Sequence, residues 1–285
     1  MRAYPAAILW VLVSTGIFAV LFASAKFAGG AVGTFQIMLL RYAASVVCLL
    51  GYAMVRGPGT SLRTPRLLTH FWRAVTGCGA VVAITWASAR MPLADATALG
   101  MSYGMLSVCL GIALLHERVR PAHWGAVALT GLGAAVVLRG QGAFSGAGPG
   151  WPAVVALASA VLMAVEGVLI RVMSQQETAL TLMLYVSGFG TVLMLGPALW
   201  EWQTLPVTGY ALCLALGPVS ILAQYCTIRG YRIAPLSVVG PVDYAWLLFA
   251  IALGAAVFGE RPGPAVLAGG GLIVLGGVWL TRVRA

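Results

Sequence analysis

Charged residues are scarce in this chain. Of its 285 residues 8% are charged, seven are acidic, and Lys26 is the single lysine. Soluble domains have about a quarter of their residues charged, whereas 61% hydrophobic residues and a mean hydropathy of +0.96 are typical of a protein embedded in a bilayer. The seventeen basic residues are scattered between apolar runs, which argues against a nucleic-acid partner.

Motifs for nucleotide-driven or covalent chemistry are lacking as well. The sequence has no GxxxxGK[ST] phosphate loop, no HExxH and no GxSxG, so neither an ATP-driven pump nor an enzyme is expected. Its five cysteines lie in apolar runs without a CxxC pair, and we interpret them as packing residues rather than metal ligands or disulfides. No cofactor and no metal site are predicted.

Long apolar runs are what the chain has in abundance. Most are close to the roughly 20 residues that cross a hydrocarbon core of about 30 Å, and the first is too long for the core of a signal peptide, so we expect it to be retained. We predict an all-α membrane protein with ten spans, at 5–25, 34–55, 68–89, 93–115, 123–138, 152–170, 179–200, 206–228, 236–258 and 265–281.

One stretch of the chain occurs twice. Residues 92–121 and 235–264, at a constant offset of 143 residues, share eight of thirty positions, where composition alone would give about two or three. The offset is half of the chain length. The sequence therefore predicts two repeats of five spans, at 1–140 and 141–285, in one membrane domain.

The basic residues predict the orientation, because Lys and Arg in short loops remain cytoplasmic. With the N-terminus inside, twelve basic residues fall on the inner side, Arg73 among them, and four on the outer side. Both termini are therefore expected in the cytoplasm. An odd number of spans in each repeat turns the second repeat upside down, as in secondary transporters, although gene duplication is also a simple way to build a large bundle.

Three ionisable residues are predicted at membrane depth, where charges are costly and often functional. At 1.5 Å per residue, Arg41 lies about 11 Å below the outer surface and Asp243 about 12 Å from the inner surface. We expect Arg41 and Asp243 to pair across the repeats or Asp243 to bind a substrate amino group, and a static buried pair is an equal alternative. Glu166 is a further candidate for these roles or for a proton site.

A group of aromatic and polar side chains is also predicted near mid-depth, where the aromatic belts of the membrane surfaces do not account for tyrosine. Such side chains suit a cavity for ring-bearing or moderately apolar solutes, although any one of them alone is more often a lipid-facing or core residue than a ligand contact. The group consists of Trp86, Met101, Tyr103, Gln224, Tyr225, Tyr244 and Trp246.

These features together resemble a known family. The glutamate-led turns HERVRP at 116–121 and GERPGP at 259–264, the glycine-rich fifth and tenth spans and the pair Arg41-Tyr42 resemble the EamA-type branch of the drug/metabolite transporter superfamily, and within it exporters of aromatic amino acids. The resemblance implies a ten-helix basket in the inner membrane whose central cavity is walled by spans three, four, eight and nine. It places Trp86, Tyr103, Gln224 and Tyr244 in that cavity.

The expected function is export of aromatic or other neutral amino acids and related small metabolites by alternating access through this cavity. The alternatives are import or exchange of a cationic or nucleoside-like metabolite, and a membrane scaffold that transports nothing. The expected partners are a small-molecule substrate and the lipid bilayer, with the protein a monomer.

Overall fold

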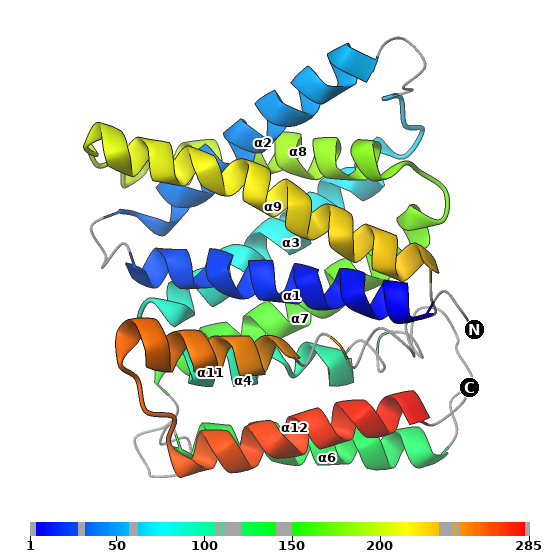
Figure 1. Cartoon of the computed structure of the whole chain (residues 1–285), viewed down its shortest axis with the longest axis vertical. Coiled ribbons are helices and arrows are strands. Elements are labelled where there is room, and N and C mark those ends of the chain that lie inside the picture. The colour runs from blue at the N-terminus through cyan, green and yellow to red at the C-terminus, as the bar shows by residue number, and fades with distance from the viewer. Residues whose placement is uncertain are drawn as a thin grey trace.

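The computed structural model describes residues 4–27, 32–56, 62–106, 110, 121–140, 150–233, 242 and 245–282, and these contain helices but no strand. Figure 1 shows the helices stacked side by side, with α2 and α8 at one end of the stack and α6 and α12 at the other. The helices are α1 (Tyr4–Phe27), α2 (Thr34–Arg56), α3 (Leu67–Ser88), α4 (Leu93–Gly100), α6 (Pro121–Gly140), α7 (Trp151–Ser174), α8 (Ala179–Trp200), α9 (Val207–Ile233), α11 (Ala245–Phe258) and α12 (Pro264–Arg282).

Each predicted span overlaps one of these helices. Six of them, α1, α2, α3, α7, α8 and α9, are long and apolar enough to cross a membrane, and shorter apolar stretches lie in α6, α11 and α12. The fourth predicted span differs, because α4 ends at Gly100. There the backbone tightens, since the Ser102 N–H donates to the Leu99 carbonyl at 3.1 Å and the Gly104 N–H to the Met101 carbonyl at 3.3 Å, the spacing of a 3₁₀ turn.

The main helix contacts join the two parts of the chain. Helix α1 packs against α9, α3 against α7, α2 against α8, α4 against α11 and α6 against α12. In every one of these pairs, one helix comes from residues 4–140 and the other from residues 150–282. The buried core therefore lies between the two parts, and neither part is packed without the other.

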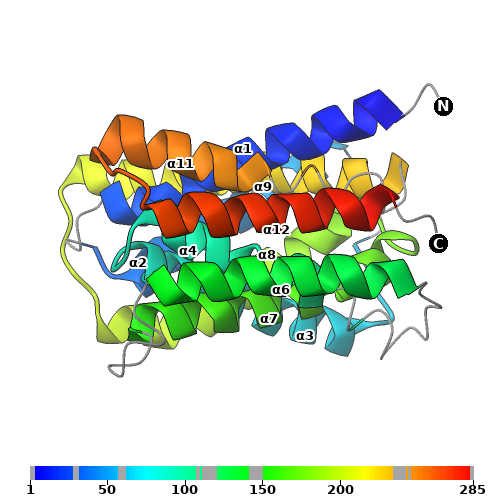
Figure 2. The same cartoon turned by 90° about the horizontal axis from the view of Figure 1, so that it is seen from below.

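The pair of α6 and α12 lies at the edge of the bundle, where both views show the two helices side by side (Figures 1 and 2). Glycines permit this approach. A Cβ atom on Gly133 would lie 2.5 Å from the carbonyl oxygen of Gly269 and 2.8 Å from a side-chain carbon of Ile273. Small residues at such a crossing let two helix backbones approach closely in lipid.

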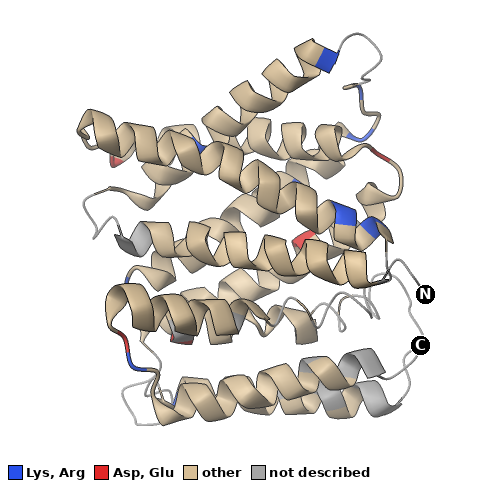
Figure 3. Cartoon of the chain, viewed as in Figure 1, with Lys and Arg blue, Asp and Glu red and all other residues tan. Residues whose placement is uncertain are grey.

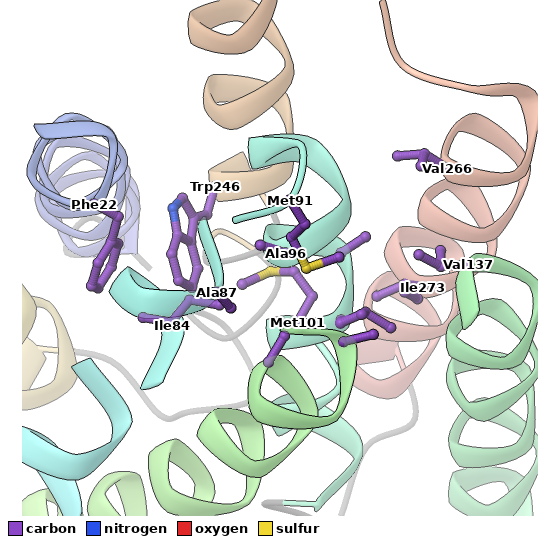
Figure 4. Close-up of a cluster of buried hydrophobic side chains, with 14 of the residues drawn as sticks. Phe22, Ile84, Ala87, Met91, Ala96, Met101, Val137, Trp246, Val266 and Ile273 are labelled. Carbon is purple, nitrogen blue, oxygen red and sulfur yellow. The ribbon is translucent and has the colours of Figure 1, made fainter. Parts of the chain in front are cut away.

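A cluster of apolar side chains connects this edge pair to the rest of the bundle (Figure 4). Val137 of α6 and Ile273 of α12 belong to it and are fully buried. Away from the edge pair, the cluster includes Met101 and Trp246. The centre of the Trp246 ring lies 4.9 Å from the centre of the Phe22 ring. Packing of these side chains holds the turn that follows α4 against α11 and α1.

Charged residues are concentrated near the ends of the helices (Figure 3). Two glutamates there cap helices across the two parts of the chain. Glu201 accepts a hydrogen bond from the Phe35 N–H, near the beginning of α2, at 2.6 Å, and Glu260 accepts one from the Leu93 N–H, at the beginning of α4, at 3.0 Å. Helix beginnings leave unpaired N–H groups and attract negative charge, so these contacts stabilise the interface of the two parts.

The glycine contact of α6 and α12 can be tested by substitution. Gly133→Ala places a methyl group 2.5 Å from the Gly269 carbonyl oxygen, so it should destabilise the protein by about 1–3 kcal/mol through overpacking. The control is Gly271→Ala in α12, where nothing lies within 4 Å of an added Cβ and the higher helix propensity of alanine should be neutral or stabilising. Thermal unfolding in detergent should therefore show a lower midpoint for Gly133→Ala alone, and equal shifts of the two variants would contradict the close approach.

Candidate functional site

A cavity of about 170 Å³ lies among α1, α3, α7 and α9. Helices α1 and α3 line it with residues spaced by four. Helix α1 presents Ser14, Phe18 and Phe22, and α3 presents Arg73 and, two turns later, Val81. Because side chains four residues apart lie on one face of a helix, each helix directs a single stripe toward the cavity.

The other two walls come from the second part of the chain. Helix α7 presents Met163, Glu166 and Ile170, and α9 presents Gln224 and Tyr231. These spacings of three, four and seven residues again define one face of each helix. Two helices from each part of the chain thus enclose the cavity.

Four side chains from the remaining helices complete the wall: Tyr42 of α2, Tyr103 just after α4, Val186 of α8 and Trp246 of α11. Tyr42 and Trp246 are almost completely buried. The cavity therefore has a polar part, with charged and hydroxyl groups, and an apolar part rich in aromatic rings.

Arg73 and Glu166 are the two charged side chains that line the cavity among the residues described. The Arg73 side chain is 1% exposed, and its Nη1 donates to the backbone carbonyl of Leu182 in α8 at 2.7 Å. Its Nη2 lies 3.9 Å from Oε1 of Glu166, whose side chain is 18% exposed. This separation exceeds the roughly 2.7–2.9 Å of a charge-assisted hydrogen bond, so each group retains capacity for another partner.

A glycine provides the room for the Glu166 carboxylate. A Cβ atom on Gly77, one turn beyond Arg73 in α3, would lie 2.7 Å from both the carboxyl carbon and Oε1 of Glu166. The absence of a side chain at this position lets the carboxylate lie directly against the backbone of α3, beside Arg73.

Arg41 lies close to this wall but does not line it. Its side chain is buried, and its guanidinium carbon lies 4.9 Å from the centre of the Tyr42 ring, a cation–π distance. The Arg-aromatic pair that contributed to the family resemblance is therefore a physical contact. The predicted partner of Arg41, Asp243, lies outside the described residues.

A second polar cluster lies at the end of the bundle where α3 begins and α7 ends. Glu177 accepts a hydrogen bond from the Thr64 hydroxyl at 2.6 Å and pairs with Nε2 of His70 at 2.6 Å. The His70 ring stacks on that of Tyr185, with centroids 4.6 Å apart. Arg232, at the end of α9, donates to the backbone carbonyl of Glu177. This cluster connects four helices close to the polar part of the cavity.

The residues predicted from sequence are distributed unevenly around the cavity. Tyr103, Gln224 and Glu166 line it together, as does Trp246. Met101 is fully buried in the apolar cluster of Figure 4 instead. The half-buried Trp86 lies under the Arg90 guanidinium, 4.1 Å from its ring centre, and is not part of the cavity wall. Tyr244 lies outside the described residues. Which of these residues bind a substrate stays a prediction.

Two features of the site differ from the sequence prediction. Arg73, counted among the basic residues of the inner side, is completely buried inside α3. Arg73 falls within the predicted span 68–89 and not in a loop, so its burial could have been predicted from its position. The wall from α1 was also missed, although its polar and aromatic residues Ser14, Phe18 and Phe22 recur every fourth position. Of the wall from α7, only Glu166 was predicted.

A bundle of apolar helices around a central cavity with a few buried charges defines a polytopic membrane transporter, and comparison with known proteins identifies its family. The model of the EamA-like transporter family matches residues 5–139 and again residues 150–282. The chain belongs to this family, within the drug/metabolite transporter superfamily, and is a multi-pass protein of the inner membrane.

Characterised relatives in this family have different named substrates. The chain is 28% identical over 279 residues to the pseudopaline exporter CntI of Pseudomonas aeruginosa, covering 97% of this chain and 96% of that protein. It is 27% identical to a riboflavin transporter of Vibrio cholerae, with 96% and 92% covered. Identity to an S-adenosylmethionine uptake transporter of Rickettsia conorii is 20%, with the same coverage.

A solved crystal structure has the same fold. It superposes with a TM-score of 0.68 at 24% sequence identity and covers 96% of each chain.

The relatives include an exporter and an uptake transporter, so membership in the family establishes transport of a small molecule without its direction.

The contact of Gly77 with Glu166 predicts a measurable coupling. Gly77→Ala should lower stability by about 1–3 kcal/mol, because the methyl group overlaps the carboxylate. The same substitution in a Glu166→Ala background should cost much less, since the overlapping atoms are gone. Thermal unfolding of the four proteins measures this cycle. Gly79→Ala, which meets only the end of the Leu162 side chain at 3.2 Å, is the control, and additive effects of Gly77→Ala and Glu166→Ala would contradict the contact.

The Glu177 cluster predicts a loss of stability at one end of the bundle. Glu177→Gln weakens the hydrogen bonds to Thr64 and His70, which should cost about 1–3 kcal/mol. The exposed neighbour Gln176 supplies the control Gln176→Ala, which should leave the midpoint of thermal unfolding unchanged. A Glu177→Gln protein as stable as the control would show that the cluster contributes nothing.

Proposed function

We propose that this protein is a secondary transporter that exports amino acids with aromatic or other neutral side chains, and related small metabolites, by alternating access through the central cavity. The observation that carries the proposal is the cavity between the two parts of the chain, with Arg73 and Glu166 in its polar part and aromatic rings in its apolar part. Its activity is transport, with no covalent chemistry.

Alternating access requires two units that can move relative to each other around the cavity. We propose that these units are two inverted repeats of five spans, 1–140 and 141–285, with both termini in the cytoplasm. The pattern of helix contacts supports this. If the two repeats are equivalent, α1 corresponds to α7 and α3 corresponds to α9. The pair of α1 and α9 then corresponds to the pair of α7 and α3, and both pairs are among the main contacts.

The composition of the wall supports the substrate class. Phe18, Phe22 and Trp246 offer aromatic surface for an apolar side chain. Arg73 and Glu166 offer one positive and one negative group for a solute that has both charges. A neutral amino acid combines these properties in one small molecule, and we propose that the protein acts as a monomer on it.

Uptake or exchange of a cationic or nucleoside-like metabolite is the second candidate. The Glu166 carboxylate in the cavity favours it, and relatives named for riboflavin and for S-adenosylmethionine uptake are compatible with larger ring-bearing solutes. A scaffold without transport is the weaker alternative, because a scaffold gains nothing from charged groups around an internal cavity.

Reconstitution tests the proposed function directly. Proteoliposomes with the purified protein should exchange or release labelled phenylalanine, tryptophan, methionine or threonine. Gly167→Phe should abolish most of this flux, because Gly167 lines the cavity and has open space above it.

Gly196→Phe is the matched control for this variant. Gly196 is exposed on α8 with nothing within 4 Å, so the added ring should leave the flux unchanged. Absence of flux for all four amino acids would exclude the proposed substrate class. Flux that survives in Gly167→Phe would exclude this cavity as the route.

A further inference from the structure

Three buried polar atoms around the cavity have no hydrogen-bond partner in the structure. They are Nε of Arg73, Oε1 of Gln224 and Nε1 of Trp246, and all three side chains line the cavity. A buried polar group without a partner is destabilising. The three atoms are among eight of this kind in the described residues, and because native proteins retain few of them, a bound solute is one partner that the three in the cavity wall can have.

The chemistry of these atoms specifies what the partner must offer. Arg73 is a donor, so its partner needs an acceptor such as a carboxylate, whereas the ring of Trp246 belongs to the apolar part of the cavity, beside Phe22. Gln224 offers an acceptor oxygen, and the Glu166 carboxylate is partly open to the cavity, so their partner needs a donor such as an ammonium group. The Arg73 guanidinium and the Glu166 carboxylate, 3.9 Å apart, leave each other incompletely satisfied.

The polar and apolar groups are separated along the bundle axis. Taking 1.5 Å per residue, Arg73 lies about 9 Å from the beginning of α3 and Glu166 about 12 Å from the end of α7. The contact of His70 with Glu177 places these two helix ends together. On α1, which begins at the same end of the bundle, Ser14 lies about 15 Å and Phe22 about 27 Å along the helix.

A ligand that satisfies the polar part must therefore have its charged groups at one end and its apolar group at the other. Among the residues described, the two charged side chains of the wall sum to zero, so a ligand with a single charge would leave this charge uncompensated in a low-dielectric site. A zwitterion adds no net charge. Among small metabolites, an α-amino acid with an apolar side chain has this distribution.

We propose that Arg73 and Glu166 form the head-group subsite of an amino-acid transporter. Arg73 binds the α-carboxylate, and Glu166 together with Gln224 binds the α-ammonium group. The side chain of the substrate lies toward Phe22 and Trp246, whose rings are 4.9 Å apart. This assignment rests on the proposed function and deepens it, because it names the groups that select the amino and carboxyl ends.

Competition with substrate analogues tests the assignment in proteoliposomes that exchange labelled phenylalanine. The competitors are phenylalanine, 3-phenylpropionate, which lacks the ammonium group, and 2-phenylethylamine, which lacks the carboxylate. The wild-type protein should prefer phenylalanine to each analogue by about tenfold or more, the value of one charged hydrogen bond.

The variants should change these preferences selectively. Glu166→Gln should remove most of the preference over 3-phenylpropionate and retain the preference over 2-phenylethylamine, and Arg73→Gln should do the reverse. Gln224→Met, which keeps the shape of the side chain, should act in the same direction as Glu166→Gln but more weakly. The control is Arg261→Gln, an exposed arginine far along the chain from the site, which should change no preference.

Stability is separated from recognition by two further measurements. A buried charge left alone is destabilising, so the double variant Arg73→Gln/Glu166→Gln, which removes both charges, is compared with the single variants by thermal unfolding. Each preference is a ratio measured within one variant, so the amount of folded protein does not affect it. The double variant should lose both preferences.

The outcomes distinguish the two levels of the proposal. Phenylalanine flux with preferences that do not move in any variant would overturn the head-group assignment, leave the transport proposal intact and show that Arg73 and Glu166 are a structural pair. No phenylalanine flux in the wild-type protein would overturn the proposed substrate class, and the head-group assignment with it.

Discussion

Packing of helices across the two parts of the chain is the constraint on which this structure depends. Lipid is as apolar as leucine, so burial of apolar side chains alone gives little driving force between helices, and close approach and polar contacts must supply it. The glycines of α6 and α12 permit the close approach. The Ser14 hydroxyl provides a polar contact between α1 and α9. It lies 2.8 Å from the Ala223 carbonyl oxygen and 2.6 Å from the Thr227 hydroxyl.

The cavity is the place where this packing is incomplete. At the edge of the bundle, glycines bring two backbones together and leave no room between them. Gly77 has no side chain either, but here the space is filled by a side chain from another helix. It is occupied by the Glu166 carboxylate, which lies beside Arg73. A charge in this position is costly in a membrane protein, which supports the role in transport proposed above.

Much of the fold follows from the sequence because the length of a span and the scarcity of charge are direct physical signals. The end of α4 at Gly100 does not follow, since it depends on a tight turn whose residues are equally compatible with a continuous helix. The site was harder to predict from the sequence than the fold. Gln224, Tyr103 and Glu166 could be placed by depth, but Arg73 was assigned to a loop because counting basic residues ignores burial. Depth also could not distinguish Met101, which is packed in the core, from residues that face the cavity.

The three glutamates near the helix ends have a consequence for the energetics of motion. Glu177 holds one end of the bundle, while Glu201 and Glu260 hold the opposite end, where α2 and α4 begin. When either end opens, water can replace these hydrogen bonds, so the net cost of each is only about 0.5–1.5 kcal/mol, or up to about 3 where a charge is involved. Differences of this size are within the range by which a bound solute shifts a conformational equilibrium. Each end of the bundle is therefore held by hydrogen bonds of small net strength, which is what the proposed alternating access requires of them.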